Sequence, residues 1–321
     1  MLLRDRAQDK TRFRQILRAS LTARSGFLYV LLASFLFAAG GNAVKLLFRQ
    51  GQAPYMLAQL RIMWAFIWLV LLLLLARPAL LHLPSQELPT LMLFGVVGVA
   101  GVQLAYYLTI ARLNIAIALL LQYLGLVGVA AWERFRRQQI VSPSVWIALG
   151  LALTGSFFVV GAYKPSLLRV NIAGIGFGLL AAALFAFYLL RASALAQRLN
   201  RWTILVYAFG SGVLMWTAYD LMARPPLPRD PSIWAAMAVI GLLGTLAPFG
   251  LIVTALQHLR PSHAGIVASS EPVFAGVIAF LLLRDGMEPL QLLGAAIVFS
   301  GVVLVQLRSD EFGAGWASPS Q

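Results

Sequence analysis

The sequence predicts an all-α integral membrane protein of ten transmembrane helices, arranged as two inverted five-helix repeats. Composition is the first reason: 60% of the residues are hydrophobic and only 11% are charged, whereas soluble domains contain about 25% charged residues. The second is length, because the apolar runs are each about 20 residues long, enough for a helix to cross roughly 30 Å of hydrocarbon. The third is a spacing of glycines and prolines that recurs in the two halves of the chain.

The apolar runs are separated by short segments rich in proline and charged residues, such as QGQAP at 50–54 and RPPLPRDP at 224–231. Barrel strands would be about half as long as these runs and would alternate. Only Arg112, Leu113 and Asn114 separate the third and fourth runs, which predicts a tight helical hairpin. We expect spans near 27–47, 55–76, 88–110, 113–132, 144–163, 172–190, 203–222, 232–255, 262–283 and 288–307.

A basic segment precedes the first span. It has no uninterrupted apolar stretch, so we do not expect a signal peptide. Apolar residues recur in it at helical spacing between arginines, which favours a short amphipathic helix on an anionic inner leaflet. A disordered basic tail that only fixes topology is equally compatible. Lysine and arginine concentrate on the same side of the membrane as this segment, so we expect a multi-pass plasma-membrane protein with both termini cytoplasmic. The expected units are a cytoplasmic segment 1–25, repeats 26–163 and 172–308, and a cytoplasmic tail 309–321.

The repeat becomes visible when the sequence is displaced by 146 residues. Gly95 then falls on Gly241, and Pro143 falls on Pro289, without a gap between about 88 and 160. The first spans of the halves also match, LASFLFA at 32–38 with LAAALFA at 180–186. Five spans is an odd number, so the second half must enter the membrane from the opposite side. Such inverted repeats rock about a site near the bilayer midplane.

Several classes of function are disfavoured by what the sequence contains. The net charge is +14. The lysine and arginine residues responsible for it lie between apolar runs and in the N-terminal segment, so they indicate membrane orientation and not nucleic-acid binding. Cysteine is absent, which excludes disulfides and thiolate chemistry. His258 and His263 lack the i, i+4 spacing of a helical metal pair. No phosphate-binding loop and no cluster of acids with a base or nucleophile is present, so we expect neither an enzyme nor a cofactor.

The order of several loose motifs resembles the EamA family of the drug/metabolite transporter superfamily. In the first half these are GNAVKLL, with Asn42 and Lys45, LAQLRIMWA, with Arg61, and the hairpin YYLTIARLNIAIALLLQYLG. In the second half they are GLLAAALFAFYLLRA and SSEPVFAGVIAFLLL, the latter containing Glu271. The resemblance covers roughly 27–161 and 172–307. It implies a carrier that exports or exchanges small metabolites, often amino acids.

The two halves depart differently from the family pattern. Leu126 occupies the place of the usual proline in the fourth span, and Gln139 that of the usual acidic residue after it. The second half keeps Pro272 and has Asp285 instead of glutamate. These differences favour a coupling element in the ninth span.

Glu271 is the strongest single candidate, because a charge near the centre of a bilayer is costly and therefore usually functional. It lies about nine residues into the ninth span, beside Ser270, and we expect it to be the only membrane-embedded carboxylate available for proton coupling. It could bind a proton or the amine of a substrate. A structural carboxylate that never titrates is the alternative.

Two cations lie near the outer ends of the first and second spans. Lys45 could contact substrate or extend to the headgroups. Arg61 could hold a carboxylate or phosphate bidentately, although a role in joining helices is slightly favoured.

Polar and aromatic side chains in the third, fourth and sixth spans would suit a small amphipathic solute, because aromatic rings offer apolar area together with a hydroxyl. Packing within helix interfaces is an equal alternative for these residues. The expected central-cavity residues are Asn42, Lys45, Arg61, Gln103, Tyr106, Gln122, Tyr123, Tyr188, Ser270 and Glu271.

The leading functional hypothesis is a secondary carrier that works by alternating access on a small-molecule solute. A non-transporting membrane sensor or assembly subunit is the alternative. The expected partners are the solute and the lipid bilayer, and a homodimer is left open.

Overall fold

The computed structural model describes residues 2–113, 115–138, 141–165, 171–223, 227–283, 286 and 288–308, and every regular element in these ranges is helical. The C-terminal tail 309–321, Gln139 and Asp285 lie outside the described residues. The longer helices are α1 (Leu2–Arg49), α2 (Pro54–Ala76), α7 (Pro143–Val159), α8 (Ile172–Ala196), α9 (Arg201–Ala223) and α14 (Pro289–Arg308). Shorter segments are η1 (Pro78–Leu81), η2 (Ser85–Glu87), α3 (Leu88–Leu93), η3 (Phe94–Gly101), α4 (Val102–Ile110), α5 (Ile115–Tyr123), α6 (Gly125–Phe135), α10 (Pro231–Gly241), η5 (Leu242–Leu246), α11 (Ala247–Ala255), α12 (Pro261–Ala268) and α13 (Glu271–Leu283).

Within the described ranges, nine helical segments are long and apolar enough to cross a membrane. The tenth expected span is α7, which is apolar but has only 17 residues. Four of the spans are composite: α3–η3–α4, α5–α6, α10–η5–α11 and α12–α13. The predicted fold of apolar helices in two repeats is therefore confirmed.

Local sequence sets where these helices begin. Helices α2, α7, α10, α12 and α14 each start at a proline, whose fixed φ suits the first helical position and whose missing N–H is not needed there. Asn171 caps α8 by accepting a hydrogen bond from the Gly174 N–H at 2.8 Å.

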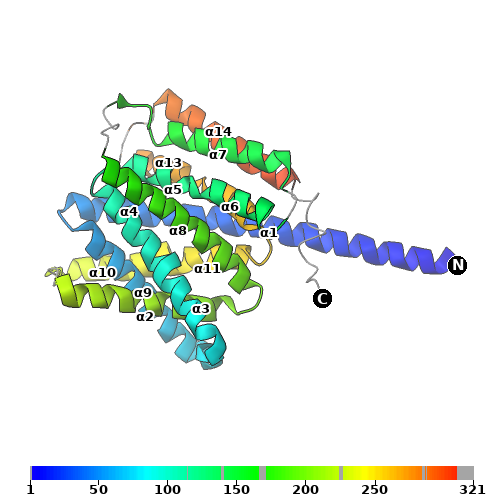
Figure 1. The fold of residues 1–321 in the computed structure, drawn as a ribbon, viewed down its shortest axis with the longest axis horizontal. Coiled ribbons are helices and arrows are strands. Elements are labelled where there is room, and N and C mark those ends of the chain that lie inside the picture. The colour runs from blue at the N-terminus through cyan, green and yellow to red at the C-terminus, as the bar shows by residue number, and fades with distance from the viewer. Residues whose placement is uncertain are drawn as a thin grey trace.

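The N-terminal segment differs from the separate short helix expected on the membrane surface. Helix α1 runs without interruption from Leu2 to Arg49 and extends well beyond the bundle (Figure 1). No proline occurs before Pro54, and Gly26, at the boundary between the basic segment and the first span, lies within the continuous helix, where a single glycine is tolerated.

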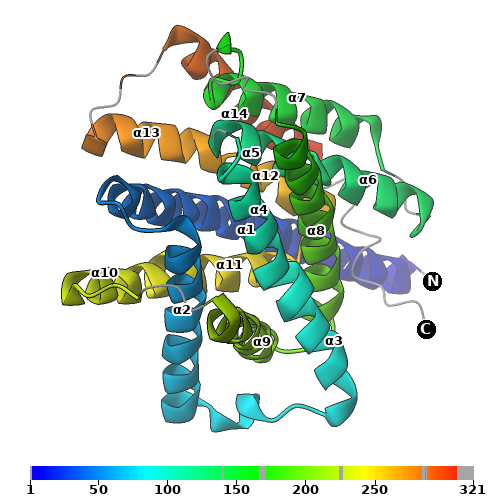
Figure 2. The same cartoon turned by 60° about the vertical axis from the view of Figure 1, so that its left-hand side comes forward.

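The contacts between the halves follow a pseudo-twofold axis. Helix α1 packs against α11 and η5 in the eighth span, just as α8 packs against α4 and η3 in the third. Helix α7 packs along α14, its own counterpart, at one edge of the bundle, while α2, α9 and α3 occupy the other edge (Figures 1 and 2). We call the side where α1 enters the bundle and α14 ends the terminal face, and the other side the opposite face.

Glycines at the α7–α14 crossing show the same symmetry in atomic detail. A Cβ added to Gly155 would lie 2.8 Å from the carbonyl oxygen of Gly294. A Cβ added to Gly301 would lie 2.9 Å from the carbonyl oxygen of Ala148. The displacement of 146 residues converts one contact into the other, so the duplication seen in the sequence also relates the packing of the two helices.

The fourth and ninth spans are interrupted at equivalent points. The Leu124 N–H donates to Leu121 O and the Ser270 N–H donates to Val267 O, at 3.1 and 3.0 Å. These i to i−3 bonds are tighter than the α-helical pattern. Leu126 is not proline, so this break forms without one. The third and eighth spans contain equivalent π-helical turns, η3 and η5, a feature that is frequent at functional sites.

Candidate functional site

Two adjoining cavities lie between the repeats. The first is about 390 Å³ and extends towards the opposite face, where Val160, Gly286 and Gln291 line it. The second is about 190 Å³ and lies deeper in the bundle. Both are lined by Phe37, Arg61, Tyr106, Tyr107, Leu119 and Glu271, so these residues form the boundary between them.

Nine of the ten expected cavity residues line one or both cavities. Asn42, Lys45, Arg61, Tyr106 and Glu271 line the first, and Gln103, Gln122, Tyr123 and Tyr188 line the second together with Arg61, Tyr106 and Glu271. Ser270 does not. It is fully buried in the break of the ninth span, where its hydroxyl donates to Val267 O at 2.7 Å.

Glu271 is the first residue of α13 and therefore stands at the N-terminus of a half-helix. The helix dipole and free N–H groups favour a carboxylate at this position. Its equivalent in the first half is Gly125, where an added Cβ would lie only 2.3 Å from Ala182 O on α8. Close packing of α6 on α8 therefore excludes any side chain there, which explains why only one half carries the acid.

Arg61 joins α2 to the π-helical turn of the eighth span. Its Nε donates to Thr245 Oγ1 at 3.1 Å and its Nη2 to Gly244 O at 2.8 Å. These bonds agree with the slightly favoured helix-joining role. A guanidinium has five N–H donors, so donors remain for other partners, and the group interacts electrostatically with Tyr107 and Glu271.

Asn42 and Lys45 lie on α1 beside the first cavity. The Asn42 amide donates to Ala38 O at 3.0 Å and to Ala275 O at 3.1 Å. The second bond ties α1 to α13 just beyond Glu271. Lys45 is exposed towards the opposite face, so substrate contact and headgroup contact both remain predictions.

The second cavity contains polar atoms without partners among the described residues. The Tyr123 and Tyr188 hydroxyls and Gln103 Oε1 are buried there and make no hydrogen bond to any described residue. Buried polar groups are nearly always satisfied, so these atoms indicate that the cavity accepts a polar ligand or water.

An aromatic cluster forms the apolar part of the same wall. Tyr188 stacks on Phe94 and Phe185, with ring centroids 5.6 and 6.3 Å apart and planes within 15° and 12° of parallel. Phe249 meets Tyr188 edge-on at 5.7 Å. Polar atoms and aromatic faces side by side would bind a solute that has both characters.

Two carboxylates besides Glu271 lie in membrane-length apolar helices and have buried oxygen atoms, which the expectation about Glu271 did not include. Glu133, near the end of α6, is fully buried, and Asp220 on α9 accepts a hydrogen bond from Gln59 Nε2 while its Oδ1 is buried without a partner in the described ranges. Both lie at the edge of an apolar run, where sequence alone does not distinguish a solvated carboxylate from a buried one.

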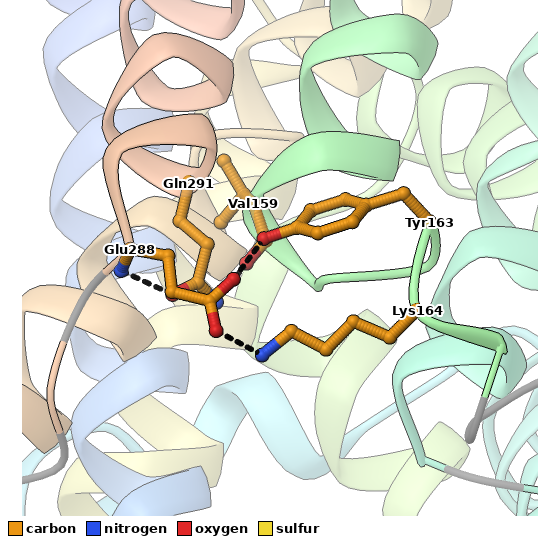
Figure 3. A network of polar contacts seen from close by, with 5 residues as sticks. All are labelled: Val159, Tyr163, Lys164, Glu288 and Gln291. Atoms are coloured by element: carbon orange, nitrogen blue, oxygen red, sulfur yellow. Dashed lines mark hydrogen bonds and ion pairs between the residues drawn. The ribbon is translucent and has the colours of Figure 1, made fainter.

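A polar network lies at the mouth of the first cavity (Figure 3). Glu288 accepts hydrogen bonds from Lys164 Nζ at 2.6 Å and from the Tyr163 hydroxyl. Gln291 accepts from the Glu288 N–H at 2.9 Å and donates to Val159 O at 3.1 Å. The bonds from Lys164 and Tyr163 lower the pKa of the Glu288 carboxyl. The network thus joins the end of α7 to the start of α14.

The described residues contain no group of three His, Cys, Asp or Glu side chains that could hold a metal ion. Inverted repeats around a central polar cavity bounded by discontinuous helices are the architecture of many secondary transporters. The chain belongs to the EamA-like transporter family, whose model matches residues 24–161 and 172–307. It is a multi-pass membrane protein of a transporter family, as the resemblance implied.

Individual relatives are similar over much of the chain. The uncharacterized inner membrane transporter YicL of Salmonella typhimurium is 25% identical over 90% of this chain and 97% of that protein. The threonine/homoserine exporter RhtA of Escherichia coli is 27% identical over 70% of this chain and 74% of that protein. A crystal structure of another protein matches with a TM-score of 0.78, covering 90% of this chain and 98% of that one at 15% identity, which shows that the fold is shared.

Proposed function

We propose that the protein is a secondary-active carrier that exports or exchanges a small amphipathic metabolite, such as an amino acid, by alternating access. The observation that carries this proposal is the pair of adjoining cavities. Arg61 and Glu271 line both of them, and the second also contains tyrosine hydroxyls that have no hydrogen-bond partner among the described residues. A guanidinium can bind a carboxylate, a carboxylate can bind an amine, and the aromatic cluster can bind an apolar side chain.

Two further observations support the proposed carrier function. A relative is named a threonine/homoserine exporter, which is an amino-acid substrate class. The excess of lysine and arginine on the terminal face supports placing both termini in the cytoplasm of a plasma-membrane protein. In that orientation the first cavity would open to the outside, as expected for an outward-open conformation.

Glu271 is the proton-coupling candidate, because it lines both cavities at the boundary between them. A proton or a substrate amine could occupy the same carboxylate in turn, which would couple the two. A sensor or assembly subunit that binds the solute without moving it is the alternative function, and a homodimer remains a proposal about assembly.

Binding can be tested with the purified protein by thermal unfolding against amino acids, nucleosides and organic cations. A ligand bound only to the native state stabilises it by about 2.7 kcal/mol at a concentration 100 times its dissociation constant. We expect stabilisation by at least one amphipathic amino acid, lost in Glu271→Gln and kept in the control Asp230→Asn, which changes an exposed carboxylate that caps α10. Equal stabilisation of both variants would contradict the proposed site.

A further inference from the structure

Glu133 lies outside both cavities and has no role in the proposed binding site. It is fully buried near the terminal end of α6. Its Oε1 accepts a hydrogen bond from the Ser262 N–H, in the first turn of α12, at 3.3 Å. Arg137 and Arg260 interact with it electrostatically. A carboxylate against the first N–H groups of a helix is stabilised by the helix dipole, so the contact holds the ends of α6 and α12 together.

The helix that Glu133 contacts, α12, is buried along most of its length. Every residue of α12 from Pro261 to Val267 is buried, and the helix is packed by α1, α6, α7, α8 and α14. Its equivalent in the first half is α5, whose residues 117 and 119–122 are partly exposed. Leu119 and Gln122 of α5 line the cavities. The two half-helices are therefore related by sequence and fold but differ in access.

The displacement of 146 residues identifies the residues of the two repeats that occupy equivalent positions at the two faces. It places Ala116 at the position of Ser262 and Ala279 at the position of Glu133. Ala116 and Ala279 both line the first cavity, which opens to the opposite face. At the terminal face the same pair of positions is occupied by Ser262 and Glu133, which are in contact. One end of the pseudo-twofold arrangement is thus open and the other is closed.

We propose that Glu133 is the latch that closes the terminal side of the carrier, by docking on the first turn of α12. Opening that side requires Glu133 to leave Ser262, so that α6 and α12 separate as α5 and α13 are separated in this structure. The inference rests on the proposed function only in that alternating access gives the latch its purpose.

The chemistry of the contact allows it to be reversible. Glu133 Oε2 is buried without a hydrogen-bond partner among the described residues, and an unsatisfied buried carboxylate oxygen is costly. When the terminal side opens, water can reach this oxygen. Hydration of the carboxylate then offsets the broken hydrogen bond to Ser262, which keeps the two states close enough in free energy to interconvert.

The absence of cysteine permits a direct test with single cysteines in the full chain. Ala268→Cys reports on the deep cavity at the end of α12, and Ala279→Cys reports on the first cavity. A membrane-impermeant maleimide is applied from either face, and labelling is compared between wild-type background, Glu133→Ala and the control Glu87→Ala. Glu87 is the matched control because this carboxylate, at the end of η2, pairs with Arg198 at 3.4 Å and makes no hydrogen bond or ion pair with Glu133 or α12.

We expect Glu133→Ala to raise labelling of Ala268→Cys from the terminal face about tenfold, because a hydrogen bond to a charged group is removed. Labelling of Ala279→Cys from the opposite face should fall, and Glu87→Ala should change neither rate. If Glu133→Ala does not fold, Glu133→Gln, which keeps an acceptor for the Ser262 N–H, should give a smaller change in the same direction. Unchanged labelling in the folded variant would overturn the latch.

Labelling and transport separate this inference from the proposed function. Altered labelling in a protein that moves no solute would leave the latch standing and remove the carrier. Solute transport together with labelling rates that do not respond to Glu133→Ala would do the reverse.

Discussion

At the scale of single residues, the site combines charges that are held in place with polar atoms that have no partner. Arg61 is fixed by η5 and Asn42 by α13, so the rim of the cavity is preorganised. The Tyr123 and Tyr188 hydroxyls are unpartnered within the described part of the chain. A solute that satisfies them would form hydrogen bonds without having to break any in the protein.

Tyr188→Phe should therefore have opposite effects on stability and binding. Removing a buried hydroxyl that has no partner among the described residues should leave the thermal stability of the empty protein unchanged or raise it. The binding free energy of the solute should weaken by about 1 kcal/mol, the net value of one hydrogen bond. Tyr207→Phe is the control, because its hydroxyl donates to Leu81 O at 2.7 Å. That variant should lose about 1 kcal/mol of stability and keep its affinity. Melting curves with and without solute measure both quantities, and a lower melting temperature for empty Tyr188→Phe would contradict the interpretation.

Glu271→Gln should keep the fold and abolish pH-dependent transport, because the amide can neither exchange a proton nor bind a substrate amine as a carboxylate does. Initial rates in proteoliposomes at acidic and neutral pH measure this. A variant that retains the pH dependence of the wild-type protein would exclude Glu271 as the coupling group.

At the scale of elements, close packing determines which half carries the acid. Gly125→Ala should destabilise the protein by about 1–3 kcal/mol, because the added methyl group must displace the backbone of α8. Gly128→Ala on the same helix is the matched control. Its Cβ would lie 3.6 Å from the Ala186 Cβ, an ordinary contact, so the variant should be neutral or more stable. Thermal unfolding in detergent distinguishes them, and equal melting temperatures would contradict the close approach.

The network between α7 and α14 should make the thermal stability of the protein depend on pH. Hydrogen bonds from Lys164 and Tyr163 lower the pKa of Glu288 in the folded protein. Because the pKa is lowered on folding, the ionised Glu288 carboxylate stabilises the folded protein above the ordinary pKa of 4.5. This stabilisation is lost as the pH falls through the folded-state pKa. Glu288→Gln should therefore have a lower melting temperature than the wild-type protein near neutral pH and the same melting temperature in strong acid. Melting temperatures across pH measure this, and a constant difference at every pH would contradict it.

The sequence contains enough information to predict the elements but not their interruptions. Prolines 143, 231 and 289 mark helix starts, and the repeat follows from glycines that align. The break at Leu124, the two π-helical turns and the burial of Glu133 have no local signal, because contacts with other helices produce them. Ser270 illustrates the limit for the site: its neighbour Glu271 lines both cavities, but its own hydroxyl is used within the break.

At the scale of the whole molecule, the fold is symmetric and its access is not. The α7–α14 crossing and the breaks in the fourth and ninth spans obey the same displacement of 146 residues. Ala116 and Ala279 line an open cavity where Ser262 and Glu133 are in contact. Because the two halves are inverted repeats, the arrangement with the opposite face open and the terminal face closed has an equivalent in which the terminal face is open and the opposite face is closed. Exchange between these two arrangements would carry a solute across the membrane.

Solute counterflow in proteoliposomes tests the central claim most directly, because it requires both binding and exchange of access. Vesicles containing the wild-type protein are loaded with an unlabelled amino acid, and uptake of the same labelled amino acid is followed. We expect counterflow of at least one amphipathic amino acid, abolished in Glu271→Gln and retained in Asp230→Asn. No counterflow of any amino acid, nucleoside or organic cation by the folded wild-type protein would contradict the claim that this chain is a carrier.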